Sequence, residues 1–268
     1  MSFSSLLPDE PLDMWETLPP EVVPDVENMV TEDDEPVDNI FSEKQQRLLT
    51  EPLFSSWPGP GEGRPFLALA NVGLFHDMHL PAIVPDAMLS LDVRAPADLK
   101  PKRNRSYFVW EYGKPPDVVV EVVSNQKGGE LGDKMRVYER IRILYYAVFD
   151  PFAQLGKVPL RLYELQVGSY VERVDGWLEK VGLGLTLWEG VYEDMEDRWL
   201  RWCDREGAPI PTGGERAEKE RLRADEEHRR ADEEHRRAEE ERRRAERLAA
   251  RLRELGVDPD DSSPSDES

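Results

Sequence analysis

Residues 117–124, DVVVEVVS, constrain the fold of this chain more than any other segment, because they are apolar on both faces apart from two acids. A run of β-branched residues with this pattern is typical of a central strand covered on both sides. Downstream, four apolar residues recur at spacings of four and three, as on one face of an amphipathic helix: Leu131, Met135, Tyr138 and Ile141. Because a second apolar stretch follows at 144–150, the sequence predicts a strand–helix–strand unit with a right-handed crossover.

Other short apolar stretches predict the remaining strands. They lie at residues 66–70, 82–93, 106–112, 160–165, 169–174 and 183–190. Their β-branched and aromatic residues favour strands, and a short helix is predicted at 39–49. The fold class that follows is α/β. Tyr138, Tyr145 and Tyr146 are interpreted as core or sheet aromatics.

Composition divides the chain into four parts: residues 1–38, 39–211, 212–256 and 257–268. The first part is rich in Pro, Asp and Glu and is expected to be mostly disordered, as is the acidic C-terminal tail. The net charge is −21 overall, but the ends carry most of it, and residues 61–211 carry only −4. The folded part is therefore mildly acidic, without the basic footprint expected for tight binding to a phosphate backbone.

Residues 212–256 repeat every seven residues, with ADEEHRR starting at residue 224 and again at residue 231. Alanine occupies one seam position of the heptad. The opposing seam position holds Glu227, Glu234 and Glu241. Because a coiled coil needs apolar residues at both positions, the pattern favours a solvated single helix over the alternative, a coiled coil.

The single cysteine, Cys203, excludes an internal disulfide framework and suits a reducing compartment. No apolar run approaches the length of about 18 residues that suggests a membrane span, and the acidic N-terminus lacks the pattern of a signal peptide. The expected location is the cytoplasm.

Two carboxylates lie within otherwise apolar strands, Asp86 in VPDAMLSL and Glu121 in PPDVVVEVV. A carboxylate on a strand buried on both faces costs on the order of several kcal/mol unless it is paired, hydrogen-bonded or bound to a cation. Each acid therefore either is satisfied structurally or belongs to a functional site. For Asp86, which follows a proline, the structural alternative is a turn cap. For Asp117, it is a cap at the entry of its strand.

At these positions the chain resembles the Uma-two family of restriction-endonuclease-like proteins. The family pattern is a PD pair, then PDxVVEVxS, an acid and a lysine in the following helix, a tyrosine one turn on, and a YxxxD strand end. The matching positions here are Pro85, Asp86, Asp117, Glu121, Ser124, Glu130, Lys134, Tyr138, Tyr146 and Asp150. The resemblance covers about residues 60–200, with its most specific cluster at 116–151.

The resemblance implies the PD-(D/E)XK nuclease fold, a mixed central sheet flanked by helices, in which acids from adjacent strands bind Mg²⁺ or Mn²⁺. Asp86 and Glu121 are the implied metal ligands, which suits Mg²⁺ because this hard cation prefers carboxylate and water. The superfamily lysine two residues after the second acid is absent, since Val123 stands there. The family moves the basic role to the next helix, so Lys134 is the third catalytic candidate. The structural alternative for Lys134 is an ion pair with Glu130.

Two functions from different classes follow as hypotheses. The first is a Mg²⁺-dependent endonuclease that hydrolyses phosphodiester bonds in DNA, with nucleic acid as its partner and no membrane association. A homodimer is the arrangement that would cut both strands. The second is a non-catalytic protein that keeps the fold and acts as an interaction module through its charged helix. The two strand acids favour the first hypothesis, whereas Val123 and the lack of a basic face favour the second.

Overall fold

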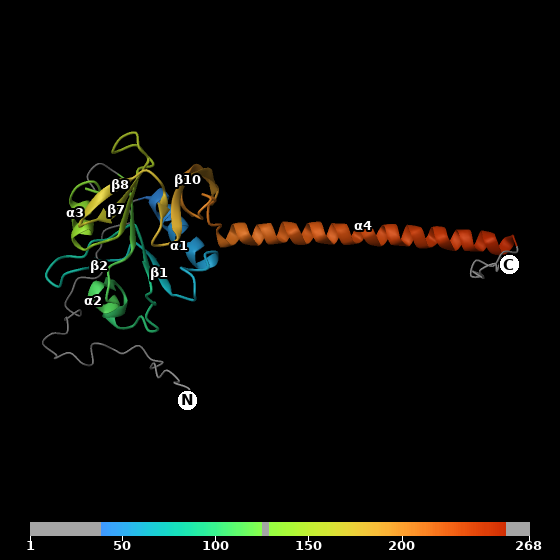
Figure 1. Ribbon diagram of the computed structural model, residues 1–268, viewed down its shortest axis with the longest axis horizontal. Helices are drawn as coiled ribbons and strands as arrows, with labels where there is room; N and C mark the ends of the chain where they lie inside the picture. The colour runs from blue at the N-terminus through green and yellow to red at the C-terminus, as the bar shows by residue number, and fades with distance from the viewer. Residues whose placement is uncertain (1–38, 125–128, 256–268) are drawn as a thin grey trace, which may run out of the picture. The chain divides into compact units, whose positions relative to one another are not determined.

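The computed structural model describes residues 39–124 and 129–255, and the predictions for residues 1–38 and 257–268 lie outside these ranges. Contacts divide the chain into two units, the first ending at Thr212 and the second beginning at Gly213. The first unit holds the sheets, and the second holds one long helix (Figure 1).

The first unit is built on a six-stranded sheet of order β1-β3-β5-β6-β7-β8. The bounds of these strands are Phe66–Ala70, Ala87–Leu91, Val118–Val122, Tyr145–Phe149, Leu160–Gln166 and Ser169–Arg173. Within this sheet β5 and β6 run parallel, and the other neighbouring pairs are antiparallel. The α/β class and the mixed central sheet with flanking helices are therefore confirmed.

β5 and β6 lie at the centre of the sheet and are joined through α3, Asp133–Arg140. All residues of both strands are buried, as expected for β-branched strands covered on both faces. The predicted strand–helix–strand unit is confirmed, with its strands parallel. The helix is shorter than predicted, because Gly132 caps its start and Leu131 lies before it, 38% exposed.

Apolar layers cover both faces of the central sheet. One layer comes from α1, Ile40–Ser55, and from a second, antiparallel sheet. That sheet has the order β11-β10-β9, with bounds Met195–Cys203, Leu183–Tyr192 and Trp177–Leu178. The amide of Gln45 in α1 bonds to both backbone groups of Leu200 in β11, at 2.8 and 3.0 Å, and so joins the helix to this sheet. The other face of the central sheet packs against α3 through Tyr138.

Several predicted boundaries differ from the observed elements. The predicted strand at 106–112 is wrong in its second half. The strand β4 holds only Tyr107–Phe108 and pairs with β2, Leu74–Phe75. The helix α2, Val109–Tyr112, follows β4 directly. Gly113 ends α2 in the left-handed region at φ 71°, which glycine adopts without steric cost. The long hairpin partner β11 was not predicted, because its first half is polar and exposed.

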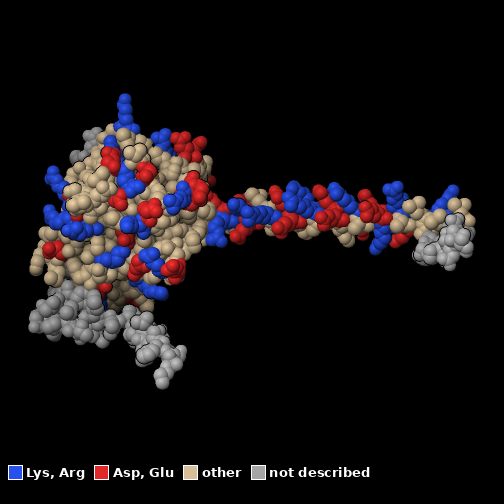
Figure 2. Space-filling model, in the orientation of Figure 1, with Lys and Arg blue, Asp and Glu red and all other residues tan. Residues whose placement is uncertain are grey.

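The described part of the second unit is α4, Gly213–Glu254, a helix of 42 residues without a buried residue. At 1.5 Å per residue it is about 63 Å long. Opposite charges lie four residues apart along it, as in the ion pair of Glu226 with Arg230 at 4.0 Å, and Figure 2 shows acidic and basic side chains interspersed over it. None of the described helices combines the length with the apolarity that a membrane crossing requires.

Candidate functional site

Asp86 immediately precedes β3, which pairs with β5. The antiparallel register of the two strands places Asp86 next to Glu121. The backbone N–H of Val122 donates to Oδ2 of Asp86 at 2.7 Å, and the side-chain amide of Gln46 in α1 donates to Oδ1 at 3.0 Å. The Asp86 carboxylate is therefore tied to the second half of β5 while it remains partly exposed.

Glu121 lies inside β5 and is 1% exposed. Alternate residues of a strand share a face, so Glu121 lies on the side of Val119 and Val123, which pack against α3. Two side chains of α3 donate to its two oxygens: Lys134 Nζ to Oε2 at 2.8 Å and Tyr138 Oη to Oε1 at 2.5 Å. Because residues four apart on a helix share one face, α3 brings both donors to the same acid.

The pKa values of Glu121 and Lys134 depend on burial and on the charges beside them. Burial raises the pKa of Glu121 to about 8; the Lys134 ammonium opposes this rise, and the negative charge of Asp86 adds to it. Burial lowers the pKa of Lys134, but the carboxylates of Glu121 and Asp86 more than offset this, and the pKa of Lys134 ends above its usual value. Lys134 is therefore cationic at neutral pH, whereas Glu121 binds a proton more readily than an exposed glutamate.

Lys134 brings an amine to the acid pair from outside β5. Val123 stands where the PD-(D/E)XK sequence pattern has a lysine. It is fully buried in the apolar layer around Tyr138, and an ammonium there would be costly. The side chain of Lys134 is 31% exposed, so it is not enclosed in that apolar layer. Its ion pair is with Glu121 at 2.8 Å rather than with Glu130, the partner considered as the structural alternative.

Glu130 is a further buried acid beside this group. It is 5% exposed, and its Oε2 has no hydrogen-bond partner among residues 39–124 and 129–255. Its negative charge contributes to the raised pKa of Lys134, after the larger effects of burial, Glu121 and Asp86. The hydroxyl of Tyr146 donates to the backbone carbonyl of Glu130 at 2.8 Å, which fixes the turn that leads into α3.

Two other acids of the family pattern stabilise the fold. Oδ2 of Asp117 accepts from the backbone N–H of Leu91 at 2.7 Å and from Lys114 at 2.5 Å, which joins β3 to the entry of β5. The carboxylate of Asp150 accepts from two backbone N–H groups in the turn after β6. Both carboxylates thus have structural partners, as the alternative interpretation of Asp117 anticipated.

Two residues that touch the acids were not predicted as part of the site. Tyr138 is buried in the core, as its interpretation as a core aromatic required, but its hydroxyl also binds Glu121. Its spacing of four from Lys134 was the available signal, since one helix face carries both. Gln46, which binds Asp86, comes from a helix 40 residues earlier in the chain, and no local pattern marks it.

Asp86 and Glu121 are the carboxylates that this site offers to a divalent cation. Among the residues that the structure describes, no three His, Cys, Asp or Glu side chains come together as a metal site. Two acids suffice for Mg²⁺, which is commonly bound by one or two carboxylates together with water and phosphate oxygens. A cation at the pair would also relieve the repulsion through which Asp86 raises the pKa of Glu121. The donor set therefore fits Mg²⁺ or Mn²⁺.

Comparison with known proteins gives a family match. Residues 33–186, more than half of the chain, match the model of the Uma2 family, whose description is "Putative restriction endonuclease". No curated protein and no solved structure matches the chain. The matched range contains Asp86, Glu121 and Lys134 together with the strands and the helix that carry them. The chain therefore belongs to Uma2, the Uma-two family of restriction-endonuclease-like proteins.

Proposed function

We propose that the protein is a Mg²⁺-dependent endonuclease that hydrolyses phosphodiester bonds in nucleic acid, with DNA as its substrate. The observation that carries this proposal is the convergence of Lys134, from α3, on the buried carboxylate of Glu121, beside Asp86 on the adjoining strand. Two acids on paired strands and an amine are the functional groups of a PD-(D/E)XK nuclease site. Membership of a restriction-endonuclease-like family supports the same reaction class.

Asp86 and Glu121 would hold the cation in this proposal. The bound ion would supply Lewis acidity, polarising the phosphate and lowering the pKa of an attacking water. Lys134 donates from Nζ to the attacking water or to a non-bridging phosphate oxygen, and its charge offsets the negative charge that builds on the phosphate. The water oxygen bonds to phosphorus and gives up a proton to solvent, the bond from phosphorus to the leaving oxygen breaks, and solvent supplies a proton to that oxygen.

The buried Val123 favours the alternative, a non-catalytic protein that acts as an interaction module through its charged helix. Three contacts support catalysis over this alternative. The amine of Lys134 reaches Glu121 without a lysine in β5. Gln46 and Tyr138 each hold one of the two acids, and such support is typical of carboxylates that ligate metals.

Cleavage of supercoiled plasmid and of single-stranded DNA by the full chain, in Mg²⁺ or Mn²⁺, tests the proposal. We expect wild-type cleavage to fall by about 100-fold or more in Asp86→Asn, Glu121→Gln and Lys134→Met, because each change removes a charged group that acts on the reacting phosphate or the cation. Mn²⁺ should also raise the melting temperature of the wild type, and this rise should vanish in Asp86→Asn and Glu121→Gln.

A matched control is Glu139→Gln. Glu139 lies on the same helix as Lys134, but its carboxylate binds the backbone N–H of Tyr170, so this variant should keep its activity and its response to Mn²⁺. A wild type that neither cleaves DNA nor gains stability from Mn²⁺ would exclude the endonuclease and leave the interaction module.

A further inference from the structure

The connection between β3 and β4 concentrates positive charge in a domain that is otherwise acidic. Residues 94–105, here called the basic segment, hold five basic side chains and one acid, Asp98. The five are Arg94, Lys100, Lys102, Arg103 and Arg105. Because residues 61–211 have a net charge of −4, the domain outside this segment carries −8. The small net charge of the domain therefore conceals a local basic surface.

The basic segment has a fixed conformation of its own. A single 3₁₀ turn, η3, spans Lys102–Asn104. The guanidinium of Arg105 donates to the backbone carbonyls of Leu99 and Lys100 at 3.1 and 2.8 Å. The amide of Asn104 donates to the carbonyl of Asp98 at 2.6 Å. These bonds brace the segment from within, so its remaining cations need not move far to meet a ligand.

Three of the cations are available for such a ligand. Arg94, Lys100 and Arg103 are exposed, and none of them forms an ion pair with another described residue. The basic segment exposes one large apolar side chain, Leu99 at 61%. A membrane-binding surface combines cations with several apolar residues, so the composition of this segment favours a soluble polyanion.

The position of the basic segment fits a long polyanion that also reaches the acid pair. Asp86 precedes β3, and the basic segment begins three residues after β3 ends. The eight steps from Asp86 to Arg94 span at most about 26 Å at about 3.3 Å per residue. One strand of a duplex advances about 3.4 Å per nucleotide, so about eight nucleotides cover this separation.

We propose that the basic segment binds the phosphate backbone of nucleic acid to one side of the candidate site. This inference rests on the proposed function for the class of ligand. Arg94 and Arg103 can each present a planar fork to a phosphate, and Lys100 adds a mobile charge. Such contacts position a duplex without reading its sequence.

The test is binding of a fluorescent 30-base-pair duplex by the full chain in EDTA, followed by anisotropy over a range of salt concentrations. The variant Arg94→Ala/Lys100→Ala/Arg103→Ala should bind about 10-fold or more weakly, and the slope of log affinity against log salt should shrink by about 2 to 3, because each lost phosphate contact contributes about 0.9. Unchanged thermal melting would show that this variant folds.

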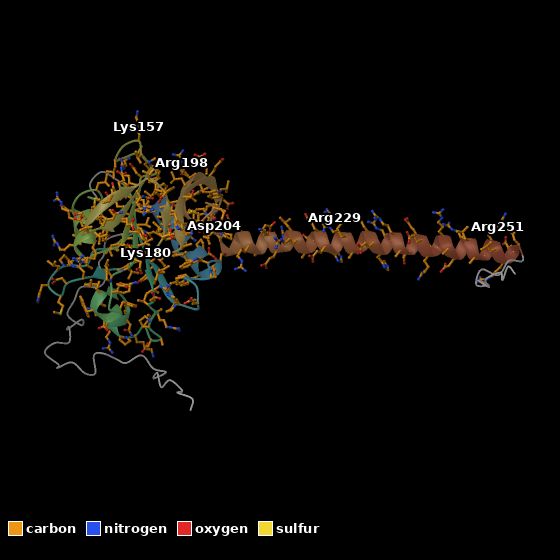
Figure 3. The ribbon with its side chains drawn as sticks, viewed as in Figure 1. Lys157, Lys180, Arg198, Asp204, Arg229 and Arg251 are labelled. Atoms are coloured by element: carbon orange, nitrogen blue, oxygen red, sulfur yellow. The ribbon has the colours of Figure 1, made fainter. Side chains whose placement is uncertain are left out.

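The matched control is Lys157→Ala/Lys180→Ala/Arg198→Ala, which removes the same charge from exposed positions elsewhere in the domain (Figure 3). It should bind within twofold of wild type. Equal losses in both triple variants, or wild-type binding by the first, would overturn the inference. So would loss of binding to phosphatidylserine vesicles by the first variant while its DNA binding stays intact.

Failure of this inference can be distinguished from failure of the proposed function. If the first variant loses duplex binding but the wild type cleaves no DNA in Mg²⁺ or Mn²⁺, the docking surface stands and catalysis fails. If the wild type cleaves DNA and the first variant binds and cleaves equally well, catalysis stands and the docking surface fails.

Discussion

The hydroxyl of Tyr138 donates a hydrogen bond to Oε1 of Glu121 at 2.5 Å, from a side chain that is fully buried in the core. A tyrosine that fills an apolar layer therefore also binds an acid of the candidate site. Lys134, one turn earlier on α3, donates to the other oxygen of the same carboxylate. The orientation of Glu121 thus depends on how α3 packs against the central sheet.

Tyr138→Phe removes this hydrogen bond and keeps the ring. We expect Mn²⁺ affinity to fall by about 10-fold, because partners that orient a ligating carboxylate typically contribute 10- to 100-fold. The free energy of unfolding should fall by about 1–3 kcal/mol, since a buried carboxylate loses a donor. Isothermal titration calorimetry and urea unfolding measure the two effects.

Tyr170→Phe is the control for this change. Its hydroxyl donates to the backbone carbonyl of Ile143 at 2.9 Å, away from the acids. This variant should lose stability and keep wild-type Mn²⁺ affinity. Equal Mn²⁺ affinity in wild type and Tyr138→Phe would reduce Tyr138 to a packing role.

Glu121→Gln should change how stability depends on pH in metal-free protein. Burial raises the pKa of Glu121 to about 8 from an ordinary 4.5, so between these values the folded state binds the proton more tightly than the unfolded state does. The stability that this group contributes is present below pH 4.5 and is lost as the pH rises towards 8. Glutamine cannot ionise, so the variant does not lose stability in this way. Between pH 5 and pH 8 its free energy of unfolding, relative to that of the wild type, should therefore rise by at least about 1 kcal/mol.

Urea unfolding in EDTA at several pH values measures this difference. Two stability curves that stay parallel from pH 5 to pH 8 would contradict the raised pKa. Added Mn²⁺ should make the wild type more stable than the variant at pH 8. The wild type can bind the cation, which stabilises its charged carboxylate, whereas the variant cannot.

Local patterns were sufficient to predict the centre of the fold. β5, α3 and β6 follow from a β-branched run, a helical spacing and a second apolar run, all within 117–150. The prediction failed where tertiary contacts override local preference. Aromatic residues at 109–112 favoured a strand, but the chain turns into α2 and Gly113 ends it. The first half of β11 is exposed and polar, so only its pairing with β10 makes it a strand.

The candidate site shows the same division. Carboxylates inside apolar strands marked Asp86 and Glu121, and the family pattern added Lys134 as an expectation. The sequence could not predict that the backbone N–H of Val122 would bind Asp86, because strand register depends on the whole sheet. The contact from Gln46 in α1 depends on how that helix packs and has no local signal.

Gln45 and Gln46 are adjacent in α1 but should have separable roles. Gln45 is fully buried and bonds to both backbone groups of Leu200. Gln45→Leu leaves both groups without their partner, which should cost about 2–4 kcal/mol of stability without changing Mn²⁺ affinity. Gln46→Leu removes a donor from Asp86 and should weaken Mn²⁺ binding by about 10-fold. Calorimetry and urea unfolding distinguish them, and the opposite assignment of the two effects would refute this division.

The seam positions of α4 allow a test of the prediction that this helix is a solvated single helix and not part of a coiled coil. Its alanines alternate with Glu227, Glu234 and Glu241, and no residue of the helix is buried. Replacing these three glutamates by leucine makes both seam positions apolar, which is what a coiled coil requires, so sedimentation velocity should show much stronger self-association than in wild type.

The control moves the leucines to Glu226, Glu233 and Glu240, one residue earlier and on another face of the helix. This variant gains the same apolar area without forming a seam, and we expect it to associate far less. Equal association of the two variants would mean that added apolar area on any face, and not an apolar seam position, is what drives this helix to self-associate.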